Sequence, residues 1–246
     1  METVTKTTDV PIRMHVLAVV AHPDDADIFC GGTLAKHADS GDEVTIAHMT
    51  RGEYGSLDGD ESAVAETREE EARRSGAVLG ASTVDFLDFE DGRVTYSLEN
   101  RLRVVDCIRE YDPDLVITHF SDDMHPDHRT TSELVTDAYY MASLPLVETD
   151  HPMCDPDNVY FFGKPTSAFE PTTFVDVTGY ESTKAEAIES HESQVEFLDE
   201  HGGIDSEFDD LVDGVLAENR TLGRQVGATY AEGFAPLHES TVEFLG

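Results

Sequence analysis

Short apolar runs rich in β-branched residues alternate with amphipathic segments along most of the chain. The apolar runs predict buried strands at Met14–Ala21, Val44–Met49, Val84–Leu87, Asp114–Phe120, Val159–Phe162 and Thr173–Val177. The longer segments predict helices from Gly31-Gly32 to Gly41 and at Glu61–Leu79, Ser97–Tyr111, Asp127–Ala142, Tyr180–Glu200 and Ile204–Arg224, with a loop at Leu144–Asp157. This alternation predicts an α/β fold with a doubly wound, mostly parallel sheet that is covered by helices on both faces.

The 246-residue chain shows no internal repeat, low-complexity block or linker, so one domain is predicted over residues 13–246. The polar residues 1–12 are predicted to be a flexible N-terminal segment, and they lack the apolar core of a signal peptide. No apolar run approaches the length of about 18 residues that a membrane span needs. The sequence therefore predicts a cytoplasmic protein with no membrane partner.

Acidic residues outnumber basic ones by 52 to 16, which gives a formal net charge of −36. Binding to nucleic acid relies on lysine and arginine, so a nucleic-acid partner is not expected. Because the acids are spread along the whole chain, we expect a halophilic protein adapted to molar salt, where charge repulsion is strongly screened. An acidic face that binds a partner is the alternative. The three cysteines are far apart and are expected to be reduced and buried.

Two polar clusters follow predicted strands directly. The segment His22–Asp25 comes after the first strand, and His125–Arg129 comes after the strand that ends at Phe120. Ligands of open α/β sheets bind outside the carboxyl ends of the strands, at the point where the strand order reverses. The first and fourth strands are usually neighbours at that point, so the two clusters should face each other.

The residue types of these clusters suit a catalytic zinc site, which takes three protein ligands and keeps one position open for water. His22 and Asp25 can provide two ligands, and a histidine of the second cluster a third. Asp24 is then free to accept a proton from a water molecule whose pKa the metal lowers toward about 7. A remaining histidine can stabilise an oxyanion and protonate a leaving amine. Together these are the parts needed for metal-assisted amide hydrolysis.

The same residues also have simpler interpretations. Asp24, Asp25 and Asp127 stand where an aspartate commonly caps a helix. A single histidine is more often structural than a metal ligand. The presence of both clusters at matching strand ends favours the metal site over these alternatives.

Three motifs resemble the PIG-L/LmbE family of zinc-dependent N-deacetylases: AHPDDADIFCGGTLA at Ala21–Ala35, TRGEYGS at Thr50–Ser56 and HPDHR at His125–Arg129. The similarity runs from about Met14 to Phe234, and it is greatest to the branches acting on N-acetylglucosaminyl malate in bacillithiol synthesis and on diacetylchitobiose. It implies a Rossmann-like, mostly parallel sheet flanked by helices on both faces. The implied reaction removes the N-acetyl group from an N-acetylglucosamine-type sugar or sugar conjugate and releases acetate and a free amine.

The resemblance also implies a role for each matching residue. Zn²⁺, or another divalent metal, would be bound by His22, Asp25 and His128. Asp24 matches the general base. His125 matches the histidine that stabilises the tetrahedral intermediate, and Asp127 would orient it.

Arg68 and Asp91 match residues that hold sugar hydroxyls in relatives. Without the resemblance, Arg68 would be interpreted as part of an ion pair on a helix surface, which contributes little stability. Arg51 and Glu53 lie on the loop after the second strand, and whether they contact substrate stays open.

Two late histidines have no derived role. His191 lies in an HESQ stretch that resembles a recurrent motif, and packing is its simpler interpretation. His238 matches a histidine that in some relatives reaches the site of a neighbouring subunit. The expected assembly is therefore a homo-oligomer, a hexamer or a trimer. The alternative functions are hydrolysis of another amide and a metal- or sugar-binding module without turnover.

Overall fold

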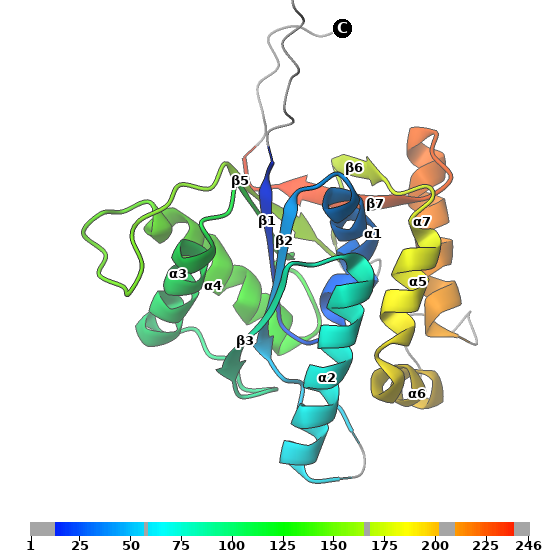
Figure 1. Ribbon diagram of the computed structural model, residues 1–246, viewed down its shortest axis with the longest axis horizontal. Helices are drawn as coiled ribbons and strands as arrows, with labels where there is room; N and C mark the ends of the chain where they lie inside the picture. Colours follow the sequence, from blue (N-terminus) through cyan, green and yellow to red (C-terminus); the bar gives the residue numbers. More distant parts are fainter. Residues whose placement is uncertain (1–12, 57–58, 165–167, 202–209, 239–246) are drawn as a thin grey trace, which may run out of the picture.

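The computed structural model describes residues 13–56, 59–164, 168–201 and 210–238. Within these ranges, seven strands form one sheet in the order β3-β2-β1-β4-β5-β7-β6 (Figure 1). The strands are β1 (His15–Val20), β2 (Glu43–Thr50), β3 (Thr83–Phe89), β4 (Leu115–His119), β5 (Asn158–Phe162), β6 (Thr173–Asp176) and β7 (Ala231–Pro236). The pairs of β7 with β5 and with β6 are antiparallel, and the other neighbouring pairs among these strands are parallel.

Helices cover both faces of the sheet (Figure 1). One face carries α3 (Leu98–Tyr111) and α4 (Pro126–Ala142). The other face carries α1 (Asp25–Asp39), α2 (Glu61–Leu79), α5 (Glu181–Glu189), α6 (Glu192–His201) and α7 (Leu211–Val226). The predicted α/β fold class is therefore confirmed.

The core consists of two main layers of apolar side chains, one on each side of the sheet. Along β1, Leu17 and Val19 pack with the α3 and α4 layer, whereas Val16, Ala18 and Val20 pack with α1. Successive side chains of a strand point to opposite faces, so a strand with helices on both sides must be apolar at every position. This requirement explains the uninterrupted apolar run in the sequence.

β1 and β4 are parallel neighbours, with Val16, Leu17 and Ala18 paired to Leu115, Val116 and Ile117. This pairing confirms the predicted adjacency of the first and fourth strands. Their carboxyl ends lie together at one edge of the sheet, so the segments that follow them begin side by side.

Helix α1 begins at Asp25, and the prediction that it begins after Gly31-Gly32 is wrong. Gly32 serves close packing instead, because a Cβ atom on it would lie 2.9 Å from Cβ of Val177. The N–H groups of Gly32 and Thr33 donate to the buried carboxylate of Glu232 at 2.9 and 2.7 Å. Lys184 pairs with the same carboxylate at 2.6 Å.

Three other parts of the chain differ from the prediction. The segment predicted as one helix over Tyr180–Glu200 forms two helices, α5 and α6, which are separated at residues 190–191. Helix α7 begins at Leu211, later than the predicted Ile204, and residues 202–209 lie outside the described residues. Strand β7 was not predicted, and the N-terminal segment 1–12 lies outside the described residues.

The three cysteines are free and buried, as expected. In the described part of the chain, no helix combines the length and the apolar character that a membrane crossing requires.

Candidate functional site

The turn after β1, residues 21–25, is held by a hydrogen bond within the turn and by hydrogen bonds to the neighbouring strands β2 and β4. The N–H group of His22 donates to Asp25 Oδ2 at 2.7 Å, and the N–H group of Ala21 donates to Nε2 of His119 at 3.0 Å. Thr50 of β2 donates its N–H group to the Ala21 carbonyl at 3.0 Å. Asp24 occupies the N-cap position of α1, but its side chain makes no capping bond. The capping interpretation of Asp24 is therefore wrong, and its carboxylate is available for other contacts.

Potential ligand atoms of three residues converge from the two clusters, and Asp25 turns a different carboxylate oxygen toward each histidine. His22 Nδ1 lies 3.2 Å from His128 Nε2 and 3.3 Å from Asp25 Oδ2, and His128 Nε2 lies 3.3 Å from Asp25 Oδ1. Ligands bound to zinc at about 2.0–2.1 Å with tetrahedral angles stand about 3.3 Å apart. All three residues are buried. The donor set therefore fits a tetrahedral divalent ion that keeps one further coordination position.

Each histidine of this triad also faces a carboxylate on its outer side. Nδ1 of His128 lies 3.0 Å from Asp123 Oδ2, while the N–H group of His125 donates to Asp123 Oδ1 at 2.8 Å. His22 Nε2 lies 3.2 Å from Asp91 Oδ1, off the direction of a linear hydrogen bond. Such outer carboxylates fix the orientation of a metal-binding imidazole and raise its basicity.

Other groups of His, Asp and Glu in this region are close enough to hold an ion, and they share members with the triad. One such group replaces His22 by His119. However, Nε2 of His119 already accepts the N–H group of Ala21 at 3.0 Å, so its lone pair is occupied. In another, Asp127 would be a ligand, but its carboxylate accepts the N–H groups of Gly92 and Val94 at 2.7 and 3.2 Å. A further group joins His125 to His22 and His128. His22 and His128 each belong to two of these three groups, and the Asp25 carboxylate reaches both of them at 3.3 Å, so the triad of His22, Asp25 and His128 stays the predicted ligand set.

His125 stands beside the triad with its ring centroid 4.6 Å from that of His22. It is the N-cap of α4, and its Nδ1 accepts the backbone N–H group of Asp127 at 3.3 Å. The neutral ring therefore carries its proton on Nε2, where it can donate. Asp127 orients His125 through this backbone N–H group, whereas its carboxylate bonds to the turn at residues 92–94. The side chain of Asp127 therefore does not cap α4.

Asp24 is bound by a buried arginine. Arg68 Nη2 donates to Asp24 Oδ1 at 2.6 Å, and Arg68 Nη1 donates to the Gly52 carbonyl at 2.8 Å. The Arg68 side chain is 3% exposed, which excludes the interpretation of a surface ion pair. Asp91 is buried and accepts the N–H group of Tyr54 at 2.9 Å. The predicted sugar contacts of Arg68 and Asp91 stay predictions.

The charges around the triad favour a cation. Burial lowers the pKa of His22, but contacts with Asp127, Asp25 and Asp91 outweigh it, so the net shift is upward. The pKa of His128 is likewise raised, because Asp25 and Asp123 outweigh the effect of burial. Burial alone would raise the pKa of Asp25, yet His128 and His119 lower it. A site that stabilises positive charge on its imidazoles is one in which a divalent cation is also stabilised.

The remaining singled-out residues lie around this centre. Arg51 pairs with Asp88 at 2.8 Å and Glu69 at 2.5 Å. Glu53 Oε1 accepts the N–H group of Asp91 at 2.9 Å.

The two late histidines lie in different places. His191 is buried, with Nε2 3.0 Å from Asp27 Oδ2 on α1, so it packs behind the site rather than in it. His238 is exposed at the end of the described chain, where its ring lies 6.2 Å from that of Tyr139.

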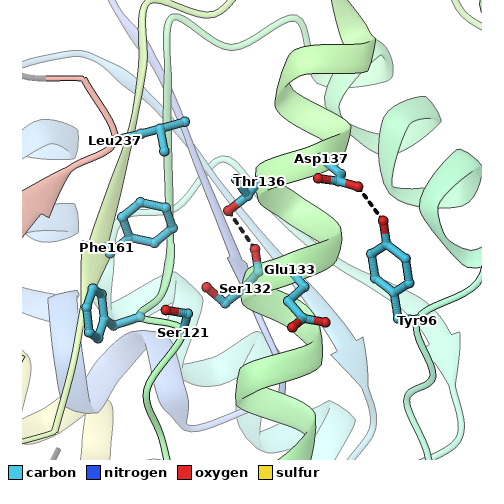
Figure 2. Close-up of a pocket in the computed structure, with 9 residues that line it drawn as sticks. Tyr96, Ser121, Ser132, Glu133, Thr136, Asp137, Phe161 and Leu237 are labelled. Carbon is cyan, nitrogen blue, oxygen red and sulfur yellow. Dashed lines mark hydrogen bonds between the residues drawn. The ribbon is translucent and has the colours of Figure 1, made fainter. Parts of the chain in front are cut away.

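A separate cavity of about 600 Å³ opens between α4 and β5 (Figure 2). Phe161 and Leu237 line one side, and Ser132, Thr136 and Asp137 of α4 line the other, with Asp137 bonded to the Tyr96 hydroxyl. None of the predicted site residues lines it. It is therefore distinct from the candidate metal centre.

Comparison with known protein families identifies the family of this chain. A family model described as "PIG-L: GlcNAc-PI de-N-acetylase" matches residues 17–139, half of the chain. The chain belongs to the PIG-L family. All eight predicted site residues lie within the matched part of this PIG-L protein, between His22 and His128.

Individual relatives carry two kinds of name. Diacetylchitobiose deacetylase of Thermococcus kodakarensis is 34% identical over 73% of this chain and 69% of its own length. 4-Oxalmesaconate hydratase of Pseudomonas putida is 27% identical over 93% of this chain and 91% of its own length. The solved N,N'-diacetylchitobiose deacetylase of Pyrococcus horikoshii is 26% identical, covers 91% of this chain and 84% of its own, and has a TM-score of 0.79.

Sequence reasoning missed two polar residues of the centre, Asp123 and His119. Asp123 stands two positions before the start of the HPDHR motif, and this proximity was the available signal. His119 is the last residue of β4 and resembles a core position in the sequence. Only the pairing of β4 with β1 brings its ring to the Ala21 N–H group.

Proposed function

We propose that this chain is a metal-dependent N-deacetylase, with zinc as the metal, that acts on an N-acetylglucosamine-type sugar or sugar conjugate and releases acetate and a free amine. The observation that carries the proposal is the convergence of His22, Asp25 and His128 at 3.2–3.3 Å, with Asp24 next to Asp25 in the sequence. The two diacetylchitobiose deacetylases among the relatives support the substrate class.

His22, Asp25 and His128 would hold the ion, which when bound supplies a Lewis acid that acidifies water and polarises a carbonyl group. The Asp24 carboxylate would accept the proton released from the attacking water, because it lies next to Asp25 but takes no part in the triad. The Arg68 guanidinium keeps Asp24 in one position during this transfer.

His125 would stabilise the negative charge that develops on the carbonyl oxygen of the substrate. With Nδ1 occupied by the Asp127 N–H group, its Nε2–H can donate to the oxyanion that forms when the amide is attacked. The proton that Asp24 accepts from the water would then pass to the departing nitrogen as the C–N bond breaks, so the sugar leaves as an amine and His125 keeps its own proton. Arg68 and Asp91 are proposed, as in relatives, to contact the sugar hydroxyls.

The test is acetate release from N-acetylglucosamine, its malate conjugate and diacetylchitobiose, with the wild-type protein and with Asp24→Asn. Loss of a general base typically lowers turnover by about 100- to 10,000-fold. The variant should lose activity to that extent and retain its metal, since Asp24 is not a ligand. A variant that turns over near the wild-type rate would show that Asp24 is not the base. A wild-type protein that releases acetate from no acetamido sugar would refute the deacetylase itself.

A hydratase is the second candidate, because a relative with that name aligns with nearly the whole chain. The same ion and the same base could direct water to a carbon–carbon double bond instead of an amide. Incubation with an unsaturated dicarboxylic substrate separates the two reactions, since hydration removes its ultraviolet absorbance without releasing acetate. Absorbance loss together with no acetate from any sugar would favour the hydratase.

A further inference from the structure

The HESQ segment, residues 191–194, connects α5 to α6 and is not part of the metal centre. Its polar side chains bond to different elements of the fold. His191 reaches Asp27 on α1, as described above. Ser193 donates its hydroxyl to Glu71 Oε2 of α2 at 2.7 Å, and its N–H group donates to Glu71 Oε1 at 2.9 Å. These bonds fix the start of α6 against the two helices that flank the site.

Gln194 makes the third connection, and its contacts lead through Arg68 to Asp24, the proposed general base. Its side-chain Nε2 donates to the Gly55 carbonyl at 2.6 Å, and the residue is 6% exposed. The N–H group of Gly55 donates to the Gly52 carbonyl at 3.0 Å and closes a turn. That same Gly52 carbonyl accepts Nη1 of Arg68. Gln194 therefore holds one end of the turn whose other end holds Arg68.

The turn has no space for other residues at its two glycines. Gly52 has a φ of +67°, and a Cβ atom there would lie 2.1 Å from Arg68 Nη1. A Cβ atom on Gly55 would lie 2.5 Å from Arg68 Nη1 and 3.0 Å from Gln194 Nε2. The guanidinium and the Gln194 amide thus press against the same short piece of backbone. A displacement of this backbone would displace Arg68 as well.

Arg68 transmits the position of the turn to Asp24. A guanidinium is a rigid planar fork, so fixing Nη1 on the turn also fixes Nη2, which bonds to Asp24 Oδ1 at 2.6 Å. We propose that Gln194 is a positioning residue that holds the Asp24 carboxylate in place through the Gly52–Gly55 turn and Arg68. The inference rests on the proposed function in that Asp24 is taken as the base.

The decisive variant is Gln194→Met, which keeps a side chain of similar length but cannot donate to the Gly55 carbonyl. A misplacement of about 1 Å at a reacting group can cost about 100-fold in rate, so we expect kcat to fall by about 10- to 100-fold. KM and metal content should stay close to those of the wild-type protein. If Gln194 contributed only packing volume, methionine would preserve kcat, and that result would overturn the inference. A raised KM at unchanged kcat would overturn it as well.

Two further measurements separate positioning from general loss of structure. Ser193→Ala removes a bond of the same helix that does not touch the turn, so it should lower thermal stability while kcat is retained. In an Arg68→Met background, Gln194→Met should produce no further loss of kcat, because its effect passes through Arg68. An additional loss as large as in the wild-type background would refute the proposed route.

The outcome for the proposed function is read separately. Acetate release by the wild-type protein tests the deacetylase assignment alone. An active wild-type protein with an equally active Gln194→Met variant counts against this inference and leaves the deacetylase intact.

Discussion

Asp123 offers a sensitive test of the metal centre because both of its oxygens are engaged. Oδ2 lies 3.0 Å from His128 Nδ1, and Oδ1 accepts the N–H group of His125 at 2.8 Å. Asp123→Asn keeps the size of the side chain but leaves only one oxygen acceptor. Whichever way the amide turns, its NH₂ group must face a donor, and the negative charge behind His128 is lost.

Removal of an outer partner of a metal-binding histidine typically costs about 10- to 100-fold in metal affinity. This range corresponds to about 1.4–2.7 kcal/mol of binding free energy. We expect Asp123→Asn to fall at the upper end, because the loss of charge and the donor conflict act together. Competition with a chromogenic chelator for zinc gives the dissociation constant of each protein.

Asp122→Asn is the matched control, because the neighbouring Asp122 is exposed and its carboxylate accepts the N–H group of Ala168 at 3.2 Å. Its zinc affinity should equal that of the wild-type protein. If Asp123→Asn bound zinc as tightly as the wild-type protein, His128 could not be a ligand that depends on this carboxylate. The assignment of the triad would then have to be revised.

Three further measurements test the structure away from the triad. Lys184→Met should lower the free energy of unfolding in urea by about 3–5 kcal/mol, since it leaves the fully buried Glu232 carboxylate without its cation; a loss below about 1 kcal/mol would contradict this. Burial lowers the pKa of His48 to about 4, against about 6.5 in an unfolded chain, so the metal-free protein should lose stability as the pH falls between these values. His48→Gln should reduce this slope by about one proton, and an unchanged slope in urea titrations would refute the assignment. The three buried thiols should not react with Ellman's reagent at about pH 8 until the protein is unfolded, because burial raises the pKa of Cys154 to about 11 and shields all three; rapid labelling of the folded protein would show otherwise.

Local patterns were sufficient for most of the sheet and its helices. β1 is marked by its uninterrupted apolar run and α2 by its charged, amphipathic pattern, and α2 was predicted with the observed bounds. Gly31-Gly32 misled the prediction of α1, since glycine usually interrupts a helix. Glycine is needed at position 32 because Val177, a residue distant in the sequence, packs closely against it.

Strand β7 was missed for a similar reason. Its sequence, AEGFAP, contains a glycine and a proline, and both are poor strand residues. Its place is set by pairing with β5 and β6 on either side rather than by its own propensity. The break between α5 and α6 also depends on tertiary bonds, those that draw His191 and Gln194 inward.

The meeting of the two polar clusters was predictable because each is a compact motif at the end of one of two neighbouring strands. The partners of the proposed ligands were less predictable. Arg68 appeared in the sequence as one charge among many on a helix, yet it is buried against Asp24. Its burial depends on the Gly52–Gly55 turn folding over it, which no periodicity in α2 reveals.

The carboxylate of Glu232 joins the C-terminal part of the chain to a helix of the N-terminal part. The match to the family ends at residue 139, but the helix that carries Asp25 donates two N–H groups to Glu232, a residue near the other end of the chain. A fragment cut after residue 139 would contain every proposed ligand and still lack β7, the strand whose Glu232 anchors the helix of Asp25. The part of the chain that carries the motifs therefore does not contain all the contacts that hold its own helix. A chimaera that grafts it onto another protein would need a buried carboxylate opposite the N–H groups of Gly32 and Thr33.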